Sequence, residues 1–276
     1  MSRRNNRART SAPAPFVPEV ANEARPQVDT VSPTEFVVLP SGGRLYPPGH
    51  PFYMRDEIEI KFMTAKHEDI LSSQSLITRG VVLDRLLENL IVDDVDVESL
   101  LPGDRNAVFL ASRITAYGSD YASVITCPQC GTKSETDIDL NSFTITSIPE
   151  DIELTENGTF ILTLRSSGVE VEVKSLNVKE RQFLTKNSEA KRKNNLPETS
   201  RTDFLKMAIV SVNGETNKSR INSFISSLPA GDSLQIRKVY SSVSPDIDTK
   251  QDYHCSSCSK TTALEVPLGL SFFWPF

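Results

Sequence analysis

The chain has 276 residues, of which 38% are apolar, and a net charge of -6. This length is sufficient for one large domain or two small ones with a substantial hydrophobic core. The acidic balance argues against a dedicated nucleic-acid-binding protein, which needs a concentrated basic face. The sequence contains no run of about 18 apolar residues, so we expect no membrane-spanning segment.

The first 33 residues are rich in Pro, Ala, Arg and Asn and show no hydrophobic periodicity. Such a segment cannot bury enough apolar surface to offset the loss of chain entropy on folding, so residues 1–33 are predicted to form a disordered N-terminal arm. The arginines at its start are not followed by an apolar stretch, which argues against a secretory signal. Four cysteines in two tight pairs, with no export signal, fit the reducing cytoplasm of the host cell, where we expect the chain to be made.

Residues 34–145 are predicted to form a first folded half. Apolar and charged residues alternate across residues 58–62, as in a half-buried strand, and Thr64 stands where the N-cap of the following helix belongs. Asp104 is predicted to cap a later helix, which Gly118 ends. The expected elements are strands at 35–39, 58–62 and 121–126 and helices at 81–92 and 105–117.

A second folded half is predicted for residues 146–266. Asn157 and Gly158 lie between two apolar runs and form a strong hairpin signal, and a capping box at Asn177 indicates the start of a helix. The polar, unpatterned residues 186–201 are predicted to form a solvated surface loop, and the alternative is that their basic side chains bind an acidic or nucleic-acid partner. The expected elements are strands at 152–155, 160–164 and 169–174 and helices at 202–212, 219–228 and 233–243.

The two halves carry the same landmarks in the same order. Residues 57–66 align without a gap with residues 170–179, and the Leu-Pro-Gly-Asp turn at 101–104 matches a similar turn at 228–232. A Cys-x-x-Cys pair then closes each half at the same distance in sequence from the turn. We interpret this pattern as an internal duplication about a pseudo-twofold axis. The predicted fold class is α+β, with two related α/β halves that contain antiparallel strands and share one four-cysteine site.

The only four cysteines form two pairs, each with the two-residue spacing that lets neighbouring thiolates bind one metal ion. Four thiolates make a saturated tetrahedral Zn²⁺ site with no open position for water, so such a site holds structure and does no chemistry. The alternative is two reduced pairs that bind no metal, and His254 is an alternative ligand beside the second pair. The predicted ligands of a shared structural zinc ion are Cys127, Cys130, Cys255 and Cys258.

Residues 267–276 form a separate C-terminal peptide, with four aromatic residues among the last five positions. A segment this apolar must pack either on the protein's own sheet or in a pocket of a partner. Aromatic anchors dominate many protein interfaces, so partner binding is the functional interpretation. The candidate partner-binding residues are Phe272, Phe273, Trp274 and Phe276.

No spacing in the sequence brings together an acid, a base and a nucleophile. None of the three histidines lies in a nucleophile elbow or in a metallohydrolase helix motif. The acidic run at 93–98 lacks the glycine and the distal glutamate of a calcium loop, so it is interpreted as a solvated turn. We predict that the protein is not an enzyme and that it has no catalytic residues.

Five motifs in the first half occur in a recognisable order. They are Leu39-Pro40-Ser41-Gly42-Gly43, Met63-Thr64-Ala65, Leu101-Pro102-Gly103-Asp104-Arg105-Asn106, Arg113-Ile114-Thr115-Ala116-Tyr117-Gly118 and Cys127-Pro128-Gln129-Cys130-Gly131. Together they resemble the baseplate protein family of T-even-type contractile-tailed bacteriophages. The resemblance covers residues 34–145 well, and the second half with its aromatic tail looks like the longer members of that family, less specifically.

The resemblance implies a structural component of the central baseplate hub in the virion tail, or a chaperone that helps to assemble the hub and does not remain in the virion. It implies other tail and hub proteins as partners and allows an oligomer within a symmetric baseplate, and it carries over no catalytic residues. A zinc-ribbon nucleic-acid-binding protein is a further alternative, which the cysteine pairs favour and the net charge opposes.

Overall fold

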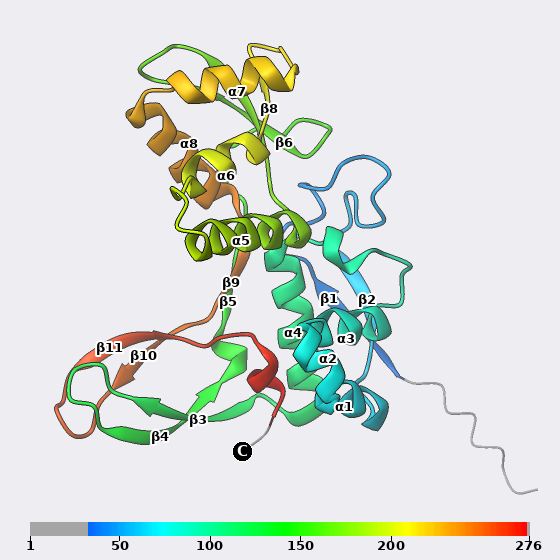
Figure 1. Cartoon of the computed structure of the whole chain (residues 1–276). Helices are drawn as coiled ribbons and strands as arrows, with labels where there is room; N and C mark the ends of the chain where they lie inside the picture. Colours follow the sequence, from blue (N-terminus) through cyan, green and yellow to red (C-terminus); the bar gives the residue numbers. More distant parts are fainter. Residues whose placement is uncertain (1–32, 275–276) are drawn as a thin grey trace, which may run out of the picture. The chain divides into compact units, whose positions relative to one another are not determined.

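The computed structural model of the protein describes residues 33–274, which belong to one compact unit. Helices are combined with small antiparallel sheets (Figure 1), which confirms the predicted mixture of elements. The predicted N-terminal arm lies outside the described residues except for Pro33. Among the described residues, no helix has the length and apolar content that crossing a bilayer requires.

The first half builds a strand hairpin, a group of helices and a long β-ribbon. Its elements in chain order are β1 (Thr34–Val38), β2 (Glu57–Lys61), α1 (Ala65–Ser72), α2 (Gln74–Arg79), α3 (Val82–Leu90), η1 (Val97–Ser99), α4 (Pro102–Tyr117), β3 (Asp120–Thr126), β4 (Lys133–Asp139) and η2 (Leu140–Ser142). Ile58 and Ile60 of β2 are fully buried, while the charged residues of this strand lie on its other face. The alternation seen in the sequence therefore decides which face of β2 meets the core.

The rest of the described chain contains a second hairpin, four α-helices and a second ribbon. Its elements are β5 (Thr144–Thr146), β6 (Thr159–Thr163), β7 (Glu170–Lys174), α5 (Val178–Lys193), α6 (Ser200–Ala208), β8 (Ile209–Val212), α7 (Lys218–Ser227), α8 (Ala230–Val243), β9 (Asp246–Asp248), β10 (Lys250–His254), β11 (Thr261–Glu265) and η3 (Leu270–Phe273).

Every sheet is small and antiparallel. β6, β7 and β8 form a three-stranded sheet in that order, and the remaining strands pair as β1–β2, β3–β4, β5–β9 and β10–β11. The pairing of β5 with β9, in which Ile145 lies opposite Ile247, joins a segment after the first ribbon to a segment before the second. The segments that lead out of the first ribbon and into the second ribbon are therefore held together by backbone hydrogen bonds.

One hydrophobic core takes residues from both halves. Leu86 and Leu87 of α3 and Val171 and Val173 of β7 are all fully buried in it. In α3 the apolar residues recur at helical spacing, and in β7 they alternate, so each element presents one face to the same core. A second, smaller cluster surrounds the cysteines at the ribbons.

The helix starts predicted at Thr64 and Asn177 are confirmed. The backbone N–H of Thr64 donates to Nδ1 of His67 at 3.0 Å at the start of α1. At the start of α5, Asn177 and Glu180 exchange reciprocal hydrogen bonds of 3.2 and 2.9 Å between side chain and backbone. Both helices thus begin with a capping box, which satisfies backbone donors that the helix itself leaves free.

Asp104 was predicted to cap α4. It instead lies buried within the first turn of this helix. Leu101 occupies the N-cap position, and Pro102 is the first helical residue. The Asp104 carboxylate accepts hydrogen bonds from the backbone N–H and the hydroxyl of Ser41, at 2.9 and 2.6 Å, and from the hydroxyl of Tyr46 at 2.8 Å. Burial raises the pKa of Asp104, and these donors oppose that rise. Asp104 therefore connects α4 to the turn after β1.

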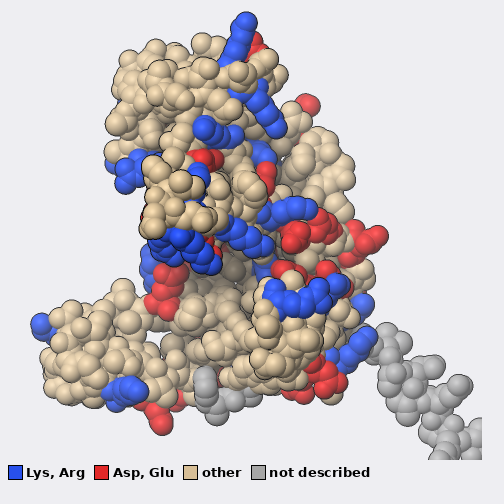
Figure 2. All heavy atoms as spheres, in the orientation of Figure 1, with Lys and Arg blue, Asp and Glu red and all other residues tan. Residues whose placement is uncertain are grey.

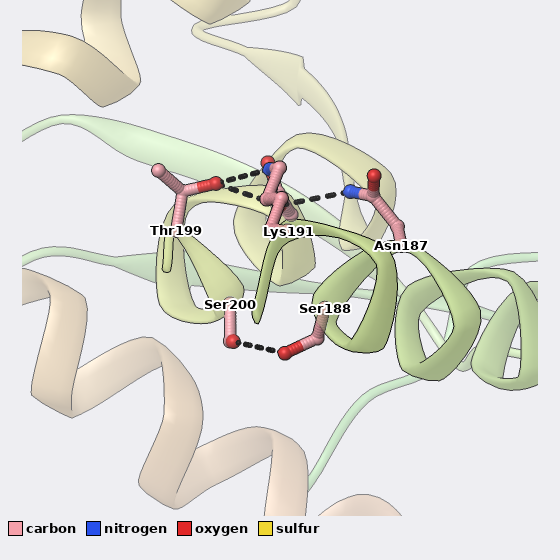
Figure 3. Close-up of polar contacts among 6 residues, drawn as sticks. Asn187, Ser188, Lys191, Thr199 and Ser200 are labelled. Carbon is pink, nitrogen blue, oxygen red and sulfur yellow. Dashed lines mark hydrogen bonds and ion pairs between the residues drawn. The ribbon is translucent and has the colours of Figure 1, made fainter. Parts of the chain in front are cut away.

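Residues 186–201 are mostly helical, which corrects the predicted surface loop. α5 and α6 occupy all of this segment except residues 194–199. Lys191 of α5 and Thr199 both donate to the carboxylate of Asp203 in α6, and the distance from Lys191 Nζ to the carboxylate is 2.6 Å (Figure 3). Helices that are joined by polar contacts need no hydrophobic periodicity, so the sequence of residues 186–201 contained no helix signal.

Two other boundaries differ from the prediction. The helix predicted at 202–212 ends early, because Ile209–Val212 is β8 and pairs with β7. The Asn-Gly hairpin is reduced to an isolated bridge between Leu154 and Phe160, although Gly158 has the expected positive φ of 71°. In both cases β7, a central strand with two partners, sets the pairing of its neighbours.

Gly103 in the first turn of α4 lies against the backbone of the second half. A Cβ at this position would lie 2.1 Å from the carbonyl oxygen of Pro245 and 2.8 Å from Cα of Asp246. Backbone atoms cannot move aside as the end of a flexible side chain can. We expect Gly103→Ala to lower the free energy of unfolding, measured by urea denaturation, by about 1–3 kcal/mol or more.

Gly231 provides the matched control for this substitution. It precedes the buried Asp232 in α8, as Gly103 precedes Asp104 in α4, but a Cβ there would meet only Oγ of Ser166, at 3.5 Å. Gly231→Ala is expected to change the stability by less than about 1 kcal/mol or to raise it, because alanine favours a helix over glycine. Equal losses in the two variants would contradict a steric origin.

Candidate metal centre

The four cysteines lie in the turns of two β-ribbons, β3–β4 and β10–β11, which run side by side in Figure 1. Cys127 and Cys130 belong to the turn of the first ribbon, and Cys255 and Cys258 belong to the turn of the second. In both ribbons the antiparallel pairing is regular up to the turn. The strand register therefore determines where each cysteine pair lies.

Both turns have the same hydrogen-bond pattern. The N–H of Gly131 donates to the carbonyl of Cys127 at 2.9 Å, and the N–H of Ser259 donates to the carbonyl of Cys255 at 2.8 Å. Gly131 and Ser259 both adopt positive φ, of 74° and 56°. Glycine takes this conformation freely, whereas serine adopts it at a small cost in strain. The two turns are copies in backbone geometry although only one of them contains glycine.

The four Sγ atoms all lie within 4.8 Å of one another. Sγ of Cys127 is 3.8 Å from that of Cys258, and Sγ of Cys130 is 3.7 Å from that of Cys255. These separations are far longer than the S–S bond of about 2.05 Å in a disulfide, and all four thiols are free. In a tetrahedral zinc site with Zn–S bonds of about 2.3 Å, the sulfur atoms lie about 3.8 Å apart. The four cysteines could therefore bind one metal ion.

A small cluster of packed side chains surrounds the sulfur atoms. Cys127, Cys255 and Tyr253 are buried there, and aliphatic side chains of β3 and β11 pack against them. The hydroxyl of Tyr253 shares a hydrogen bond with that of Ser134, which connects β10 to β4. Because the cluster is small, it contributes little apolar burial to hold the two ribbons together.

The surroundings shift the pKa values of three of the thiols in different directions. Contact with the hydroxyl of Thr132, 3.3 Å from the sulfur, lowers the pKa of Cys130 to about 6, and the backbone N–H of Cys258 lowers the pKa of Cys255. The backbone of Lys260 lowers the pKa of Cys258, but burial and the neighbouring sulfurs outweigh it and raise this pKa to about 11. Four thiolates cannot gather without a cation, because their charges repel one another. A divalent cation at the centre would remove this repulsion.

His254, the alternative ligand, does not join the cluster. Its side chain is exposed, and Nδ1 lies 3.3 Å from Oγ1 of Thr261 across the ribbon. Within residues 33–274, the four cysteines are the only group of His, Cys, Asp and Glu side chains close enough to share one ion. The acidic run at 93–98 is accordingly no such group.

Two of the four candidate partner-binding residues are packed inside the protein. Phe272 and Phe273 are fully buried, and the ring of Phe272 lies 5.3 Å from that of Tyr121, between centroids. Trp274 is half-buried, and Phe276 lies outside the described residues. Phe272 and Phe273 thus pack against the protein's own core, which is the alternative to partner binding for these two residues.

Arg113 of α4 holds this C-terminal segment, and the sequence analysis gave it no role. The side chain is 2% exposed, and its Nε donates to the carbonyl of Phe272 at 3.1 Å. Its Nη1 donates to the carbonyl of Gly118 at 3.1 Å, and the guanidinium lies 4.9 Å from the ring centroid of Tyr117. The sequence does contain a signal for this role of Arg113. It is an arginine on the apolar side of a helix, four residues before a tyrosine.

Comparison with known protein families supports the resemblance found in the sequence. A family model described as T4 bacteriophage base plate protein matches residues 33–274. Comparisons with curated proteins and with solved structures gave no match. The matched region includes both ribbons and all four cysteines, so the family pattern extends across both halves. The chain therefore belongs to the T4 bacteriophage base plate protein family.

Proposed function

We propose that the protein is a non-catalytic structural component of the phage baseplate hub, in which one Zn²⁺ ion bound by the four cysteines stabilises the fold. Membership of the base plate family supports a structural role among other baseplate proteins. The observation that carries the metal assignment is the approach of four Sγ atoms to within 4.8 Å. A site saturated by four thiolates suits a scaffold, because it has no open position for substrate or water.

We further propose that residues 34–145 and 146–266 are related halves that arose by duplication. In each half a third segment pairs with a two-stranded hairpin. Ile91 forms an isolated bridge with β2 in the first half, and β8 pairs with β7 in the second. Residues 1–33 and 267–276 then flank the halves as an arm and a C-terminal peptide. The shared order of strands supports a common ancestor for the two halves.

The two buried aspartates also support duplication. Asp104 of α4 bonds to Ser41 in the turn after β1. Asp232 of α8 accepts hydrogen bonds from the backbone N–H groups of Ser166 and Ser167, at 2.9 and 3.0 Å, in the turn after β6. In each half, an aspartate in the first turn of the last helix thus binds the turn of the first hairpin.

The zinc proposal predicts equal effects from the two ribbons. Cys127→Ser and Cys255→Ser each remove one of four ligands from a shared site, so both are expected to abolish metal binding. Both should lower the free energy of unfolding by at least about 2 kcal/mol, because metal binding contributes to folding. Inductively coupled plasma mass spectrometry of the purified chains measures the metal, and urea denaturation measures the stability.

Ser256→Ala is the control, since Ser256 is exposed in the same turn and offers no sulfur. This variant should keep one zinc ion per chain, and treatment with a chelator should then lower its stability to that of the cysteine variants. A Cys127→Ser chain that retains metal while Cys255→Ser loses it would show that the ribbons do not share a site.

We propose that Trp274 and Phe276 carry the partner contact that the C-terminal sequence suggests. Phe272→Ala is expected to cost about 3–5 kcal/mol of stability, because it leaves a cavity among buried rings. Trp274→Ala should cost less than half as much and should reduce incorporation of the chain into tails in infected cells. Normal incorporation of the Trp274→Ala variant would remove this role.

The alternative role is a hub-assembly chaperone that leaves before the virion is complete. Quantitative mass spectrometry of purified virions and of isolated baseplates distinguishes the two. We expect peptides of this chain in both, in a fixed ratio to the other baseplate proteins. Its presence in assembly intermediates together with its absence from virions would establish the chaperone instead.

The zinc-ribbon nucleic-acid-binding alternative has less support. Across residues 120–139 and 250–265, which hold the two ribbons, acidic residues outnumber basic ones. Phosphate groups would be repelled by such a surface, since binding to nucleic acid depends on Lys and Arg. The ribbons are therefore better suited to contact with proteins.

A further inference from the structure

Charge is unevenly distributed over the chain, and two regions of opposite sign adjoin. Residues 175–243 hold 12 Lys and Arg against 6 Asp and Glu, although the whole chain has a net charge of -6. Residues 88–98 hold acidic residues and no basic ones. Figure 2 shows basic side chains along α5 and acidic side chains beside them, over the segment between α3 and α4. Such segregation produces a local field that can orient a partner.

The basic region includes a regular stripe along α5. The basic stripe consists of Lys179, Phe183, Lys186, Ala190 and Lys193, which follow one another at spacings of three and four residues and therefore share one face of the helix. All five are exposed, and Phe183 is 59% exposed. At about 1.5 Å per residue the stripe is about 21 Å long. An aromatic ring between lysines is suited to a surface that offers both carboxylates and an apolar pocket.

The stripe is held on a rigid support. Lys191, on another side of α5, pairs with Asp203 of α6, and the hydroxyls of Ser188 and Ser200 meet at 3.1 Å (Figure 3). These contacts fix the direction in which the stripe faces. Within residues 33–274, Lys186 and Lys193 form no ion pair, so their charges are available to a partner.

The acidic region contains a hollow of about 400 Å³ between α3 and η1. We call it the acidic hollow. Apolar and acidic residues line it, and they include Ile91, Val95, Val97, Asp94 and Asp96. Asp94 and Asp96 are exposed and form no ion pair among the described residues. The Oδ1 atom of Asp96 accepts a hydrogen bond from the backbone N–H of Glu98 at 3.0 Å, at the start of η1. The hollow thus combines apolar residues with carboxylates that carry no ion pair, and these two features complement the basic stripe.

The stripe and the hollow adjoin at one point. Nζ of Lys179 lies 3.7 Å from the carboxylate of Glu98, and the N–H of Val178 donates to the carbonyl of Leu100 at 2.9 Å. The rest of the stripe leads away along a straight helix, so Lys193 lies about 21 Å from Lys179 and cannot fold back on the hollow of its own chain. In a dimer with twofold symmetry, the stripe of each copy can instead meet the hollow of the other copy.

We propose that the protein forms a twofold-symmetric dimer in which the basic stripe of each copy docks on the acidic hollow of the other. Phe183 enters the apolar part of the hollow, and Lys186 and Lys193 face Asp94 and Asp96. Both contacts form at once because the two surfaces adjoin in each chain, so the interface is closed and does not continue into a filament. The inference is independent of the metal ion and of the hub assignment.

Sedimentation velocity of the full chain tests this proposal. We expect a dimer at low ionic strength that weakens on going from about 0.05 M to about 0.5 M salt, because salt screens exposed charges. The stripe variant Lys186→Glu/Lys193→Glu and the hollow variant Asp94→Lys/Asp96→Lys each place like charges opposite one another. Each should raise the dissociation constant more than about 100-fold.

Mixing the two variants is the decisive step. In a 1:1 mixture, the reversed stripe of one faces the reversed hollow of the other, and the unchanged surfaces also match, so the dimer should return. Lys66→Glu/Lys218→Glu is the control, since it changes the net charge as the stripe variant does at exposed positions on α1 and α7. This control should remain dimeric, and circular dichroism should show that every variant is folded.

Three results would overturn the proposal. The first is a wild-type chain that remains monomeric at about 100 µM in low salt, where charge attraction is least screened. The second is a mixture of the stripe and hollow variants that stays monomeric. The third is binding of a DNA duplex that the stripe variant loses while the oligomeric state does not change, which would assign the stripe to nucleic acid.

Discussion

The approach of four sulfur atoms is the interaction on which the arrangement of the two ribbons depends. The apolar cluster around Cys127, Tyr253 and Cys255 is small, so hydrophobic burial alone contributes little to joining the ribbons. The thiols are also close enough to repel one another once ionised. A central divalent cation would turn this repulsion into attraction, which is why a metal would have a large structural effect here.

The body of the protein depends on different forces. One core collects apolar side chains from both halves, and contacts without hydrophobic character position the parts around it. Asp104 connects α4 to the turn after β1, Gly103 lets α4 approach the backbone at Pro245, and Arg113 holds the carbonyl of Phe272. None of these contacts involves the four cysteines, so a metal ion bound by them would act first on the ribbons.

A rigid body with exposed contact surfaces fits a component of a large assembly. Family membership gives the baseplate as the setting, and a metal ion bound by all four thiolates would have no open position for chemistry. Contacts within such an assembly are made by the surface, where apolar and charged side chains lie together on fixed elements. The stripe along α5 and the hollow between α3 and η1 are such surfaces, and both face directions fixed by packed helices.

Local patterns in the sequence determined the strands with alternating residues, the capping boxes, and the cysteine spacing that the ribbons bring together. These features depend on neighbours in the chain, so a period or a short motif reveals them. Tertiary structure decided the helical state of residues 186–193 and 200–201, the buried role of Asp104 and the packing of Phe272 and Phe273. Each of these depends on a contact between segments far apart in sequence, and such contacts leave no local period.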